Sequence, residues 1–518
     1  MLRKIRIALA AIFFICITGL FLDITGEWQS IFGWMAKLQF LPAVMGLSLV
    51  PILIVLALTL IMGRFYCSVI CPMGVFQDVV AWISRKFKKK NPYSYSKPKT
   101  WLRLTVLVLF IILVVTGFNG IAILVAPYSA YGRMVNNLLQ PLYIMANNAL
   151  AGVAAENESY TFWAVDPHLF VAPLLIVAAI TFLVIVVLAC IGGRTYCNTI
   201  CPVGTVLGYV AKFSWFKPYI EVSKCKNCMK CSKNCKASAI DIKGGMVIDY
   251  TRCVACGNCL EECKFGALHF GHPTAAARIM PEKPAKTAKA NSTAKKSAEV
   301  TAEKATEKVD TNLRSMLTTA VVLGASAAIK AQEMKVDGGL AVIEDKKMPV
   351  RQTKIVPPGA LSASNLASKC TGCQLCVSNC PNGVLRPSTD LKTFMQPFSS
   401  YENGYCRPEC NRCSQVCPAG AIKPISKEEK SSIQIGHAVW EPDNCIVITD
   451  GAECGNCARH CPVGAITMVP QDPDDNFSPL IPAVNEERCI GCGACENLCP
   501  SRPLSAIHVE GHLVHKHI

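Results

Sequence analysis

Cysteine is the residue of this chain most able to carry chemistry, with thirty copies in 518 residues. All of them except Cys16 and Cys190 fall into short spacings that recur along the chain. Disulfide frameworks belong to short secreted domains, whereas recurring short spacings are typical of metal sites. We therefore predict iron–sulfur clusters of the 4Fe-4S type, with structural zinc as the alternative. Cys16 and Cys190 lie in apolar stretches and are predicted to be buried, unreactive thiols.

Two tandem runs with the spacing C-x2-C-x2-C-x3-C stand between Cys225 and Cys263. In this bacterial ferredoxin pattern the first three thiolates bind one cluster and the fourth reaches the neighbouring cluster. Zinc ribbons typically use two separated C-x2-C pairs, which favours iron here. The predicted ligands are Cys225, Cys228, Cys231 and Cys263 for one cluster, and Cys253, Cys256, Cys259 and Cys235 for the other. One departure is that Lys236 and Lys264, rather than proline, follow the fourth cysteines.

Four further sets of four cysteines fill the C-terminal region, and a proline follows the last cysteine of each set. Four clusters are therefore predicted here, which makes six in the chain. By the exchange rule we expect the two outer sets to swap their fourth ligands, and the two inner sets to do the same. The predicted groups are Cys370, Cys373, Cys376 and Cys499; Cys489, Cys492, Cys495 and Cys380; Cys406, Cys410, Cys413 and Cys461; and Cys445, Cys454, Cys457 and Cys417.

An internal repeat relates residues 63–74, GRFYCSVICPMG, to residues 193–204, GRTYCNTICPVG. Each copy follows an apolar stretch, so the region resembles two related halves. Cysteines four apart share a helix face, and the repeat is expected to bring Cys67, Cys71, Cys197 and Cys201 together. Three hypotheses stay open for these four thiols: a further metal or cluster site, a set of redox-active thiols, or close helix packing without a ligand.

The elements that must position these motifs begin with four stretches that lack charged residues. Residues 38–63, 104–132 and 169–193 are long enough to span a bilayer at about 20 residues per helix, and residues 7–22 are nearly so. Basic residues precede the first stretch and fill the connection around residues 85–103, whereas the other two connections hold acidic residues. Basic loops stay in the cytoplasm, so both ends of the four-helix unit are predicted to lie inside.

The predicted organisation is an α-helical membrane domain of four spans in two related hairpins (residues 1–215), followed by small α+β bacterial-ferredoxin-like domains. The first of these, with two clusters, covers residues 216–272, and the second, with four clusters, covers residues 360–518. Residues 273–312 are rich in Lys, Ala, Thr and Glu and predict a disordered linker. The apolar segment at residues 313–330 fits an export signal or signal-anchor, with an ordinary core helix or a fifth span as the alternatives.

The formal net charge of +16 does not indicate nucleic-acid binding. Much of the excess lies beside the apolar stretches and in the Lys-rich tract, which is typical of membrane-flanking and solvated segments. The chain has no C-x-x-C-H haem motif and no Gly-rich dinucleotide fingerprint after a strand. The clusters are therefore the predicted redox cofactors.

With these motifs in place, residues 1–272 resemble NapH, the membrane ferredoxin-type protein of periplasmic nitrate reduction. The shared features are four spans, two C-x3-C-P motifs and a terminal two-cluster domain. Related membrane modules occur in the NosR and CcoG families. Residues from about 312 onward resemble NapG and its relative MauM, four-cluster proteins carried across the membrane behind an export signal. The chain thus resembles a NapH–NapG fusion.

The resemblance implies a multi-pass protein of the bacterial cytoplasmic membrane that oxidises quinol and passes electrons to an extracytoplasmic reductase or cytochrome. The two-cluster domain would be cytoplasmic and the four-cluster domain periplasmic. The NapG signal has paired arginines, whereas this chain has Arg314 alone. Asp166 and His168 border the fourth stretch as candidates for proton handling, although such loop residues are more often solvated or structural. The alternative function is maturation or regulation, in which the protein reduces a metal or supports assembly of a respiratory enzyme.

Overall fold

The computed structural model describes residues 2–87, 93–156, 162, 164–165, 172–243, 245–272, 344–475 and 478–518. The predicted linker at 273–312, the apolar segment at 313–330, and Asp166 with His168 lie outside these residues. The described residues up to 272 and those from 348 onward belong to one unit.

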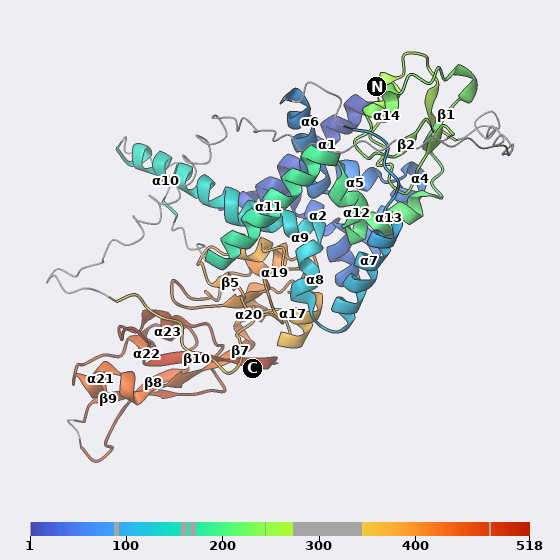
Figure 1. The fold of residues 1–518 in the computed structure, drawn as a ribbon. Helices are drawn as coiled ribbons and strands as arrows, with labels where there is room; N and C mark the ends of the chain where they lie inside the picture. Colours follow the sequence, from blue (N-terminus) through green and yellow to red (C-terminus); the bar gives the residue numbers. More distant parts are fainter. Residues whose placement is uncertain are drawn as a thin grey trace, which may run out of the picture. The chain divides into compact units, whose positions relative to one another are not determined.

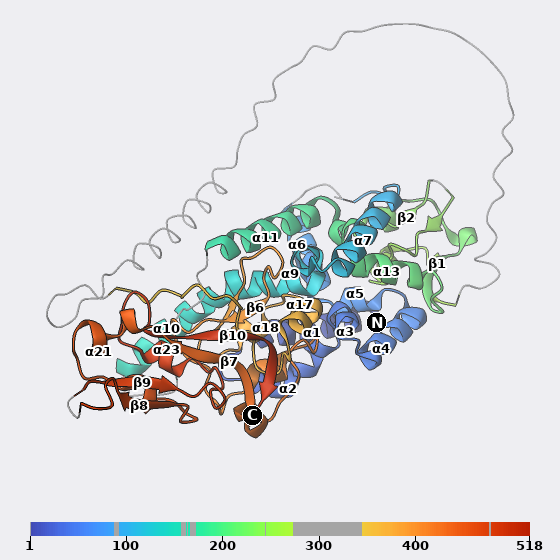
Figure 2. The same cartoon turned by 90° about the horizontal axis from the view of Figure 1, so that it is seen from below.

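The N-terminal part of this unit is helical (Figure 1, Figure 2). Its longest elements are α1 (Leu2–Leu22) and α11 (Ala172–Gly192), two uninterrupted apolar helices. In the described part of the chain, these are the two helices long and apolar enough to cross a membrane. The apolar helices α4 (Leu49–Met62), α7 (Thr100–Val115) and α13 (Pro202–Ala211) are shorter.

Two of the uncharged stretches are divided into shorter helices. Within residues 38–63, α3 (Phe40–Met45) is followed by a turn at Leu47, with φ of +53°, before α4 begins. Within residues 104–132, α7 stops ahead of Gly117, whose φ of +81° suits glycine, and Pro127 starts a new helix. The described residues therefore do not show four single spanning helices. Absence of charge predicts an apolar stretch, but glycine and proline decide where its helices end.

Helix α6 (Pro72–Phe87) packs against α1, α9 and α11. The remaining helical elements are α2 (Glu27–Lys37), α5 (Phe65–Val69), α8 (Asn119–Ala122), η1 (Ile123–Val125), α9 (Pro127–Met134), the π-helix η2 (Val135–Leu139), α10 (Gln140–Glu156) and α12 (Thr195–Thr199).

The two-cluster domain follows α13 and contains two small antiparallel sheets. Strand β1 (Lys217–Ile220) pairs with β4 (Leu268–Gly271), and β2 (Ile240–Asp241) pairs with β3 (Val247–Ile248). The short helices η3 (Val222–Lys224), α14 (Lys230–Lys233) and α15 (Asn258–Glu262) carry the cysteine loops. Isoleucines of the strands and the cysteines of both loops share one apolar core, so the metal-binding loops and the sheets stabilise each other.

The C-terminal region contains two similar cysteine-rich halves joined by the longest strand pair, β7 (Ile433–Trp440) with β10 (Ile507–His517). Smaller pairs are β5 (Leu385–Pro387) with β6 (Pro397–Ser399), and β8 (Ile466–Pro470) with β9 (Leu480–Val484). The helices are α17 (Ala363–Lys369), α18 (Leu375–Ser378), α19 (Arg412–Val416), α20 (Lys427–Ser431), η5 (Pro442–Asn444), α21 (Ile446–Thr449), α22 (Asn456–Arg459) and α23 (Ala494–Leu498).

The first half of the C-terminal region packs on the helical part through buried polar contacts. The amides of Asn136 and Asn137 each donate to Oε1 of Gln374 at 3.0 Å. Asn379 donates to the carbonyl of Leu20 at 3.0 Å, at the C-terminal end of α1. One continuous apolar core contains residues of both segments.

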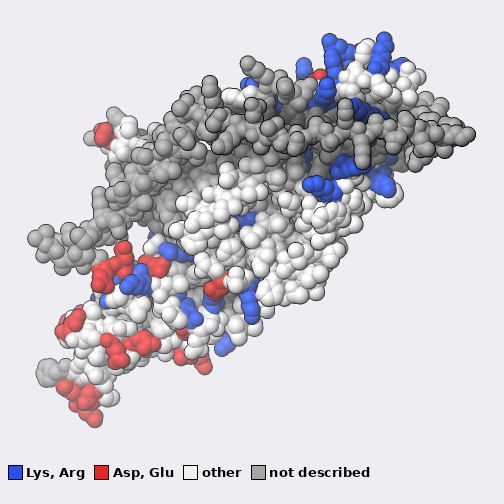
Figure 3. All heavy atoms as spheres, in the orientation of Figure 1, with Lys and Arg blue, Asp and Glu red and all other residues white. Residues whose placement is uncertain are grey.

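Charge is distributed unevenly over the surface. On the face in Figure 3, an uncharged surface covers the N-terminal helices, Lys and Arg gather beside the two-cluster domain, and Asp and Glu gather over the C-terminal strands. Large apolar side chains of α4, α7 and α11 are exposed, among them Leu53, Leu109 and Leu183. Such an apolar exterior is typical of a surface that is covered by lipid or by a partner.

Candidate functional site

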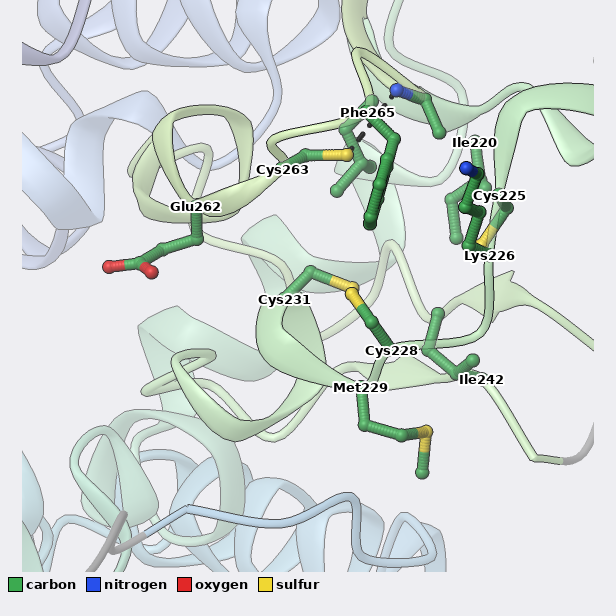
Figure 4. A pocket seen from close by; sticks show the side chains of 12 residues that line it. Ile220, Cys225, Lys226, Cys228, Met229, Cys231, Ile242, Glu262, Cys263 and Phe265 are labelled. Atoms are coloured by element: carbon green, nitrogen blue, oxygen red, sulfur yellow. Dashed lines mark hydrogen bonds between the residues drawn. The ribbon is translucent and has the colours of Figure 1, made fainter.

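The first cysteine group of the two-cluster domain surrounds a small cavity (Figure 4). Cys225, Cys228, Cys231 and Cys263 line it together with apolar side chains such as Phe265. The backbone N–H of Ala267 donates to the sulfur of Cys263 at 3.3 Å. These are the four thiols that the spacing groups together, and they reach one space because Asn227 and Met229 adopt positive φ in the tight loop.

The second group of this domain has the same construction. Cys235, Cys253, Cys256 and Cys259 line a neighbouring apolar cavity, and the N–H of Ala239 donates to the sulfur of Cys235 at 3.4 Å. Burial raises the pKa of the Cys253 thiol to about 12 and that of Cys231 to about 11. Because a thiol binds metal as the thiolate, loading these groups with iron has to displace protons.

The C-terminal cysteines are grouped differently from the nested exchange that the sequence led us to expect. One cavity is lined by Cys380, Cys406, Cys410 and Cys413. Another is lined by Cys445, Cys454, Cys457 and Cys499. Cys380 and Cys499 therefore do not exchange between the outermost sets, and the nested arrangement is wrong.

The remaining two groups follow the same order. The Cys417 thiol lies within electrostatic range of Cys370, Cys373 and Cys376. Cys461 has the same relation to Cys489 and Cys492, which share a set with Cys495. Sets adjacent in sequence thus exchange their fourth cysteines. The physical reason is that α18 packs on α19 and α22 packs on α23, which places the last cysteine of each set beside its sequence neighbour.

These groups fit 4Fe-4S clusters by the chemistry of their donors. Each consists of four cysteines, and backbone amides donate to individual sulfurs, such as Gly372 to Cys370 at 3.4 Å and Ala465 to Cys461 at 3.2 Å. Amide donors stabilise the negative charge of a thiolate-bound cluster and tune its potential. Within the described residues, no group of three or more His, Cys, Asp or Glu side chains is arranged to hold a single metal ion.

The repeated C-x3-C-P motifs come together at the centre of the helical part. Cys67, Cys71, Cys197 and Cys201, hereafter the buried quartet, are each only 3% or 4% exposed. The Cys201 thiol lies within electrostatic range of the other three, and the side-chain amide of Gln77 donates to the Cys197 sulfur at 3.1 Å. This arrangement agrees with the prediction that the repeat brings the four thiols together. Reactive cysteines are typically at least partly exposed, so the burial of all four thiols argues against the hypothesis of redox-active thiols.

The other two cysteines lie apart from these groups. Cys16 is buried in α1, as expected, whereas Cys190 near the end of α11 is partly exposed.

A buried carboxylate, Asp78, is a feature that the sequence analysis missed. Arg194 contacts its Oδ1 through Nε at 2.6 Å, Lys236 contacts Oδ2 at 2.5 Å, and Arg6 contacts Oδ2 at 3.3 Å. Burial alone would raise the pKa of Asp78, but Arg194 and Lys236 hold that pKa below its ordinary value. A signal was available, since Asp78 is the only acidic residue between Glu27 and Glu156.

Known domain families match most of the cysteine motifs. A 4Fe-4S binding domain matches residues 44–90 and 174–221, the two segments that contain the C-x3-C-P motifs. Another 4Fe-4S binding domain matches residues 246–269. Two 4Fe-4S dicluster domains match residues 369–422, and residues 405–465 with 451–502. Several 4Fe-4S clusters are thereby supported along the chain.

Similar proteins are also of the ferredoxin type. The chain is 31% identical over 167 residues to the methylamine utilization ferredoxin-type protein MauM of Methylobacillus flagellatus, covering 31% of this chain and 70% of that protein. It is 29% identical over 177 residues to the ferredoxin-type protein NapG of Escherichia coli K12, covering 31% and 75%. With NapF of the same strain it shares 26% identity over 187 residues, covering 35% and 100%.

No solved structure matches the chain. The match to MauM covers more than two thirds of that protein, and the domain matches agree with it. The chain therefore belongs to the family of ferredoxin-type 4Fe-4S proteins that includes MauM, and it is an iron–sulfur electron-transfer protein.

Proposed function

We propose that the protein carries electrons across the bacterial cytoplasmic membrane, from the quinol pool or a cytoplasmic donor to an extracytoplasmic reductase or cytochrome. The observation that carries this proposal is the position of α1 between two iron–sulfur regions. At its N-terminal end Arg3 pairs with Glu261 of the two-cluster domain. Just beyond its C-terminal end, Arg412 donates to the carbonyl of Ile24 at 3.2 Å.

The length of α1 supports a membrane crossing between these two contacts. Its 21 residues span about 30 Å, which equals the hydrocarbon thickness of a bilayer. If α1 crosses the membrane, the two-cluster domain and the C-terminal region lie on opposite sides. We further propose that α11, α4 with α3, and α7 with α8 complete four crossings within residues 1–215. Passage of the C-terminal region to the opposite side is assigned to the segment at residues 313–330, which the sequence predicts as an export signal or signal-anchor. The basic residues beside the two-cluster domain favour a cytoplasmic position for that domain.

The thiol groups form a series along this direction. Between the two-cluster domain and the buried quartet stands Arg64, which donates from Nη1 to the carbonyl of Thr251 at 3.1 Å. Its Nη2 lies 3.9 Å from the sulfur of Cys67. Thr251 is two residues before the ligand Cys253, so one side chain connects both thiol groups.

On the other side of the quartet, Tyr196 donates to the carbonyl of Val125 at 2.7 Å, and Arg133 donates to the carbonyl of Ile123 at 3.1 Å. Gly132, next to Arg133, packs so tightly that a Cβ there would lie 2.4 Å from the carbonyl oxygen of Cys373. The series therefore continues into the first C-terminal group.

The two C-terminal halves also adjoin through their cysteine loops. The backbone N–H of Cys406 donates to the carbonyl of Cys492 at 2.9 Å. The proposed order of the C-terminal groups is thus the one containing Cys370, then Cys406, then Cys492, then Cys445. A 4Fe-4S cluster supplies one-electron redox chemistry. The two clusters proposed for the two-cluster domain could therefore accept the two electrons of one quinol.

The buried quartet is the proposed position of a further iron–sulfur cluster in this series. Its four thiols come from both halves of the repeat, and water has little access to them. Iron and acid-labile sulfide quantified after Cys67→Ala and Cys197→Ala test this assignment. Iron content equal to that of the unmodified protein would discard it.

The whole proposal is tested on anaerobically purified protein in detergent. Dithionite should reduce every cluster, and a soluble quinol analogue should reduce part of them, as followed by low-temperature electron paramagnetic resonance. A full dithionite response without any quinol or quinone response would favour the maturation or regulatory function instead. A topology reporter fused after Ile518 and active only outside the cytoplasm tests the placement of the C-terminal region.

A further inference from the structure

A cavity of about 440 Å³ lies between α1 and α6 and reaches the two-cluster domain. Its size falls within the range of sites for small organic ligands, which extends from about 300 to about 1,000 Å³. None of the cysteine groups lines it. Its walls differ in polarity from one end to the other, and this difference identifies the kind of ligand.

One end of the cavity is apolar and continues onto an exposed apolar surface. The α1 residues Ile7, Ala10, Ala11, Phe14 and Ile15 line it with the spacing of a single helix face. Ile7 is 46% exposed and Ile15 is 61% exposed. If α1 crosses the membrane, this opening faces lipid, so a lipid-soluble molecule can enter from the bilayer.

The α6 wall has the same character. Val79 and Trp82 line the cavity and are 39% and 59% exposed. The two helices thus leave a slot between apolar walls that opens along the exterior of the helical part. A long hydrocarbon chain would have contact on both sides.

The other end of the cavity is polar and belongs to the Asp78 ion-pair group. Asp78, Arg6 and Lys236 line it. Arg6 is 7% exposed, and its Nε finds no hydrogen-bond partner among the residues that the structure describes. An unpartnered buried donor is costly, and a ligand oxygen at this end of the cavity would provide the acceptor.

This polar end is adjacent to one cysteine group. Lys236 directly follows Cys235, and Asn258 directly precedes Cys259. Both cysteines line the second cavity of the two-cluster domain. A redox-active ring at the polar end would therefore lie beside the loops that hold that group.

The charges at the polar end favour a neutral head over a phosphate. Four cationic side chains line the cavity. Arg6 and Lys236 are paired with Asp78, and Arg3 is paired with Glu261. Arg85 donates to the side chain of Asn234 at 2.8 Å. The carboxylate of Asp78 would in addition repel a phosphodiester. The ring oxygens of a quinone or quinol can exchange hydrogen bonds with such groups without adding charge.

We propose that this cavity binds the ring of a membrane quinone or quinol, with the ring oxygens near Arg6 and Asp78 and the isoprenoid chain between α1 and α6. The proposal rests on the electron-transfer function proposed above and gives it a site of entry.

The test is a binding titration of the full chain in detergent with 2-heptyl-4-hydroxyquinoline N-oxide, a fluorescent quinone analogue. Ala11→Phe places a ring inside the cavity, and Ile12→Phe places the same ring on the exposed side of α1, outside the lining. We expect the first variant to weaken binding by about tenfold or more, and the second to bind like the unmodified protein. Val79→Phe fills the cavity from α6 and should weaken binding in the same way. Agreement between the two variants would show that the loss does not come from misfolding of Ala11→Phe alone.

Absence of binding to the unmodified protein, or equal binding by all variants, would overturn the site. Mass spectrometry of the lipids that co-purify with each protein gives a second test. The site would also be overturned if the unmodified protein carried a stoichiometric anionic phospholipid that Ala11→Phe lacks, while both proteins bound the analogue equally. Quinol reduction of the clusters separates this site from the proposed function. If quinol reduced the clusters equally in the unmodified protein and in Ala11→Phe, the function would stand and the site would be rejected. If binding depended on the cavity but quinol reduced no cluster, the site would stand and the function would be rejected.

Discussion

Arg194 of the second C-x3-C-P motif donates a 2.6 Å hydrogen bond from Nη1 to the backbone carbonyl of Cys67 in the first motif. Arg64 of the first motif returns this contact to the carbonyl of Cys197 at 3.1 Å. The shared arginine of each copy therefore holds the cysteine loop of the other copy. This reciprocal contact explains why the repeat contains arginine inside an otherwise apolar region.

Arg194→Met should destabilise the helical part strongly. The substitution leaves Asp78 without its 2.6 Å partner and the Cys67 carbonyl without its donor. Breaking a buried ion pair costs about 3–5 kcal/mol, and this cost should appear as a lower thermal unfolding temperature in detergent. Lys224→Met, which removes an exposed partner of Glu221, is the control and should change stability by less than about 1 kcal/mol. Equal unfolding temperatures for the two variants would contradict the buried ion-pair group.

Gly74→Ala and Gly204→Ala should each disturb the buried quartet. A Cβ at Gly74 would lie 2.1 Å from the carbonyl oxygen of Cys67, and one at Gly204 would lie 2.2 Å from that of Cys197. We expect a loss of about 1–3 kcal/mol for each, as for other overpacked sites. Gly152→Ala in α10 meets no atom within 4 Å and should be neutral or stabilising by up to about 1 kcal/mol. Thermal unfolding of the three variants checks the contrast, and a stable Gly74→Ala would show that the motifs are less tightly packed.

Double cysteine variants should distinguish the observed exchange from the nested one. Cys370 and Cys417 belong to one group, so Cys370→Ala combined with Cys417→Ala should remove about four iron atoms per chain, no more than either change alone. Cys370→Ala combined with Cys499→Ala affects two groups and should remove about eight. Iron and sulfide analysis of anaerobic protein measures both. A loss of about eight iron atoms from the first double variant and about four from the second would support the nested arrangement instead.

The C-terminal strand pair should lose stability in mild acid because of His515. Burial, together with the charges of His512 and His517, lowers the pKa of His515 to about 4. The folded state therefore favours neutral His515, so its stability is complete above the ordinary histidine pKa of about 6.5 and declines as the pH falls toward about 4. We expect a loss of at most roughly 2 kcal/mol, because His515 is partly exposed.

Urea unfolding at about pH 7 and about pH 5 measures this dependence. His515→Gln should flatten it, while His460→Gln, at an exposed position, should leave it as it is. An unchanged pH dependence in His515→Gln would assign the acid sensitivity to other groups.

The sequence by itself determined which residues carry the chemistry. Cysteine spacing within one loop is a local property, so the first three ligands of the groups of Cys225 and Cys253 follow from the spacing alone. Their fourth ligands were predicted by the exchange between two tandem runs, which has one possible partner here. The internal repeat likewise indicated that Cys67 and Cys197 lie near each other, because related halves pack in a related way. The apolar stretches of α1 and α11 were also evident, since hydropathy needs no tertiary information.

Only the tertiary structure decided the relations between distant segments. The partner of each fourth cysteine depends on which helices pack together, such as α18 on α19, and no local spacing records that choice. The same holds for Asp78, whose three cationic partners come from α1, the second motif and the two-cluster domain. Burial of the quartet and the cavity between α1 and α6 arise in the same way, because packing is a property of surfaces that meet only after the chain has folded.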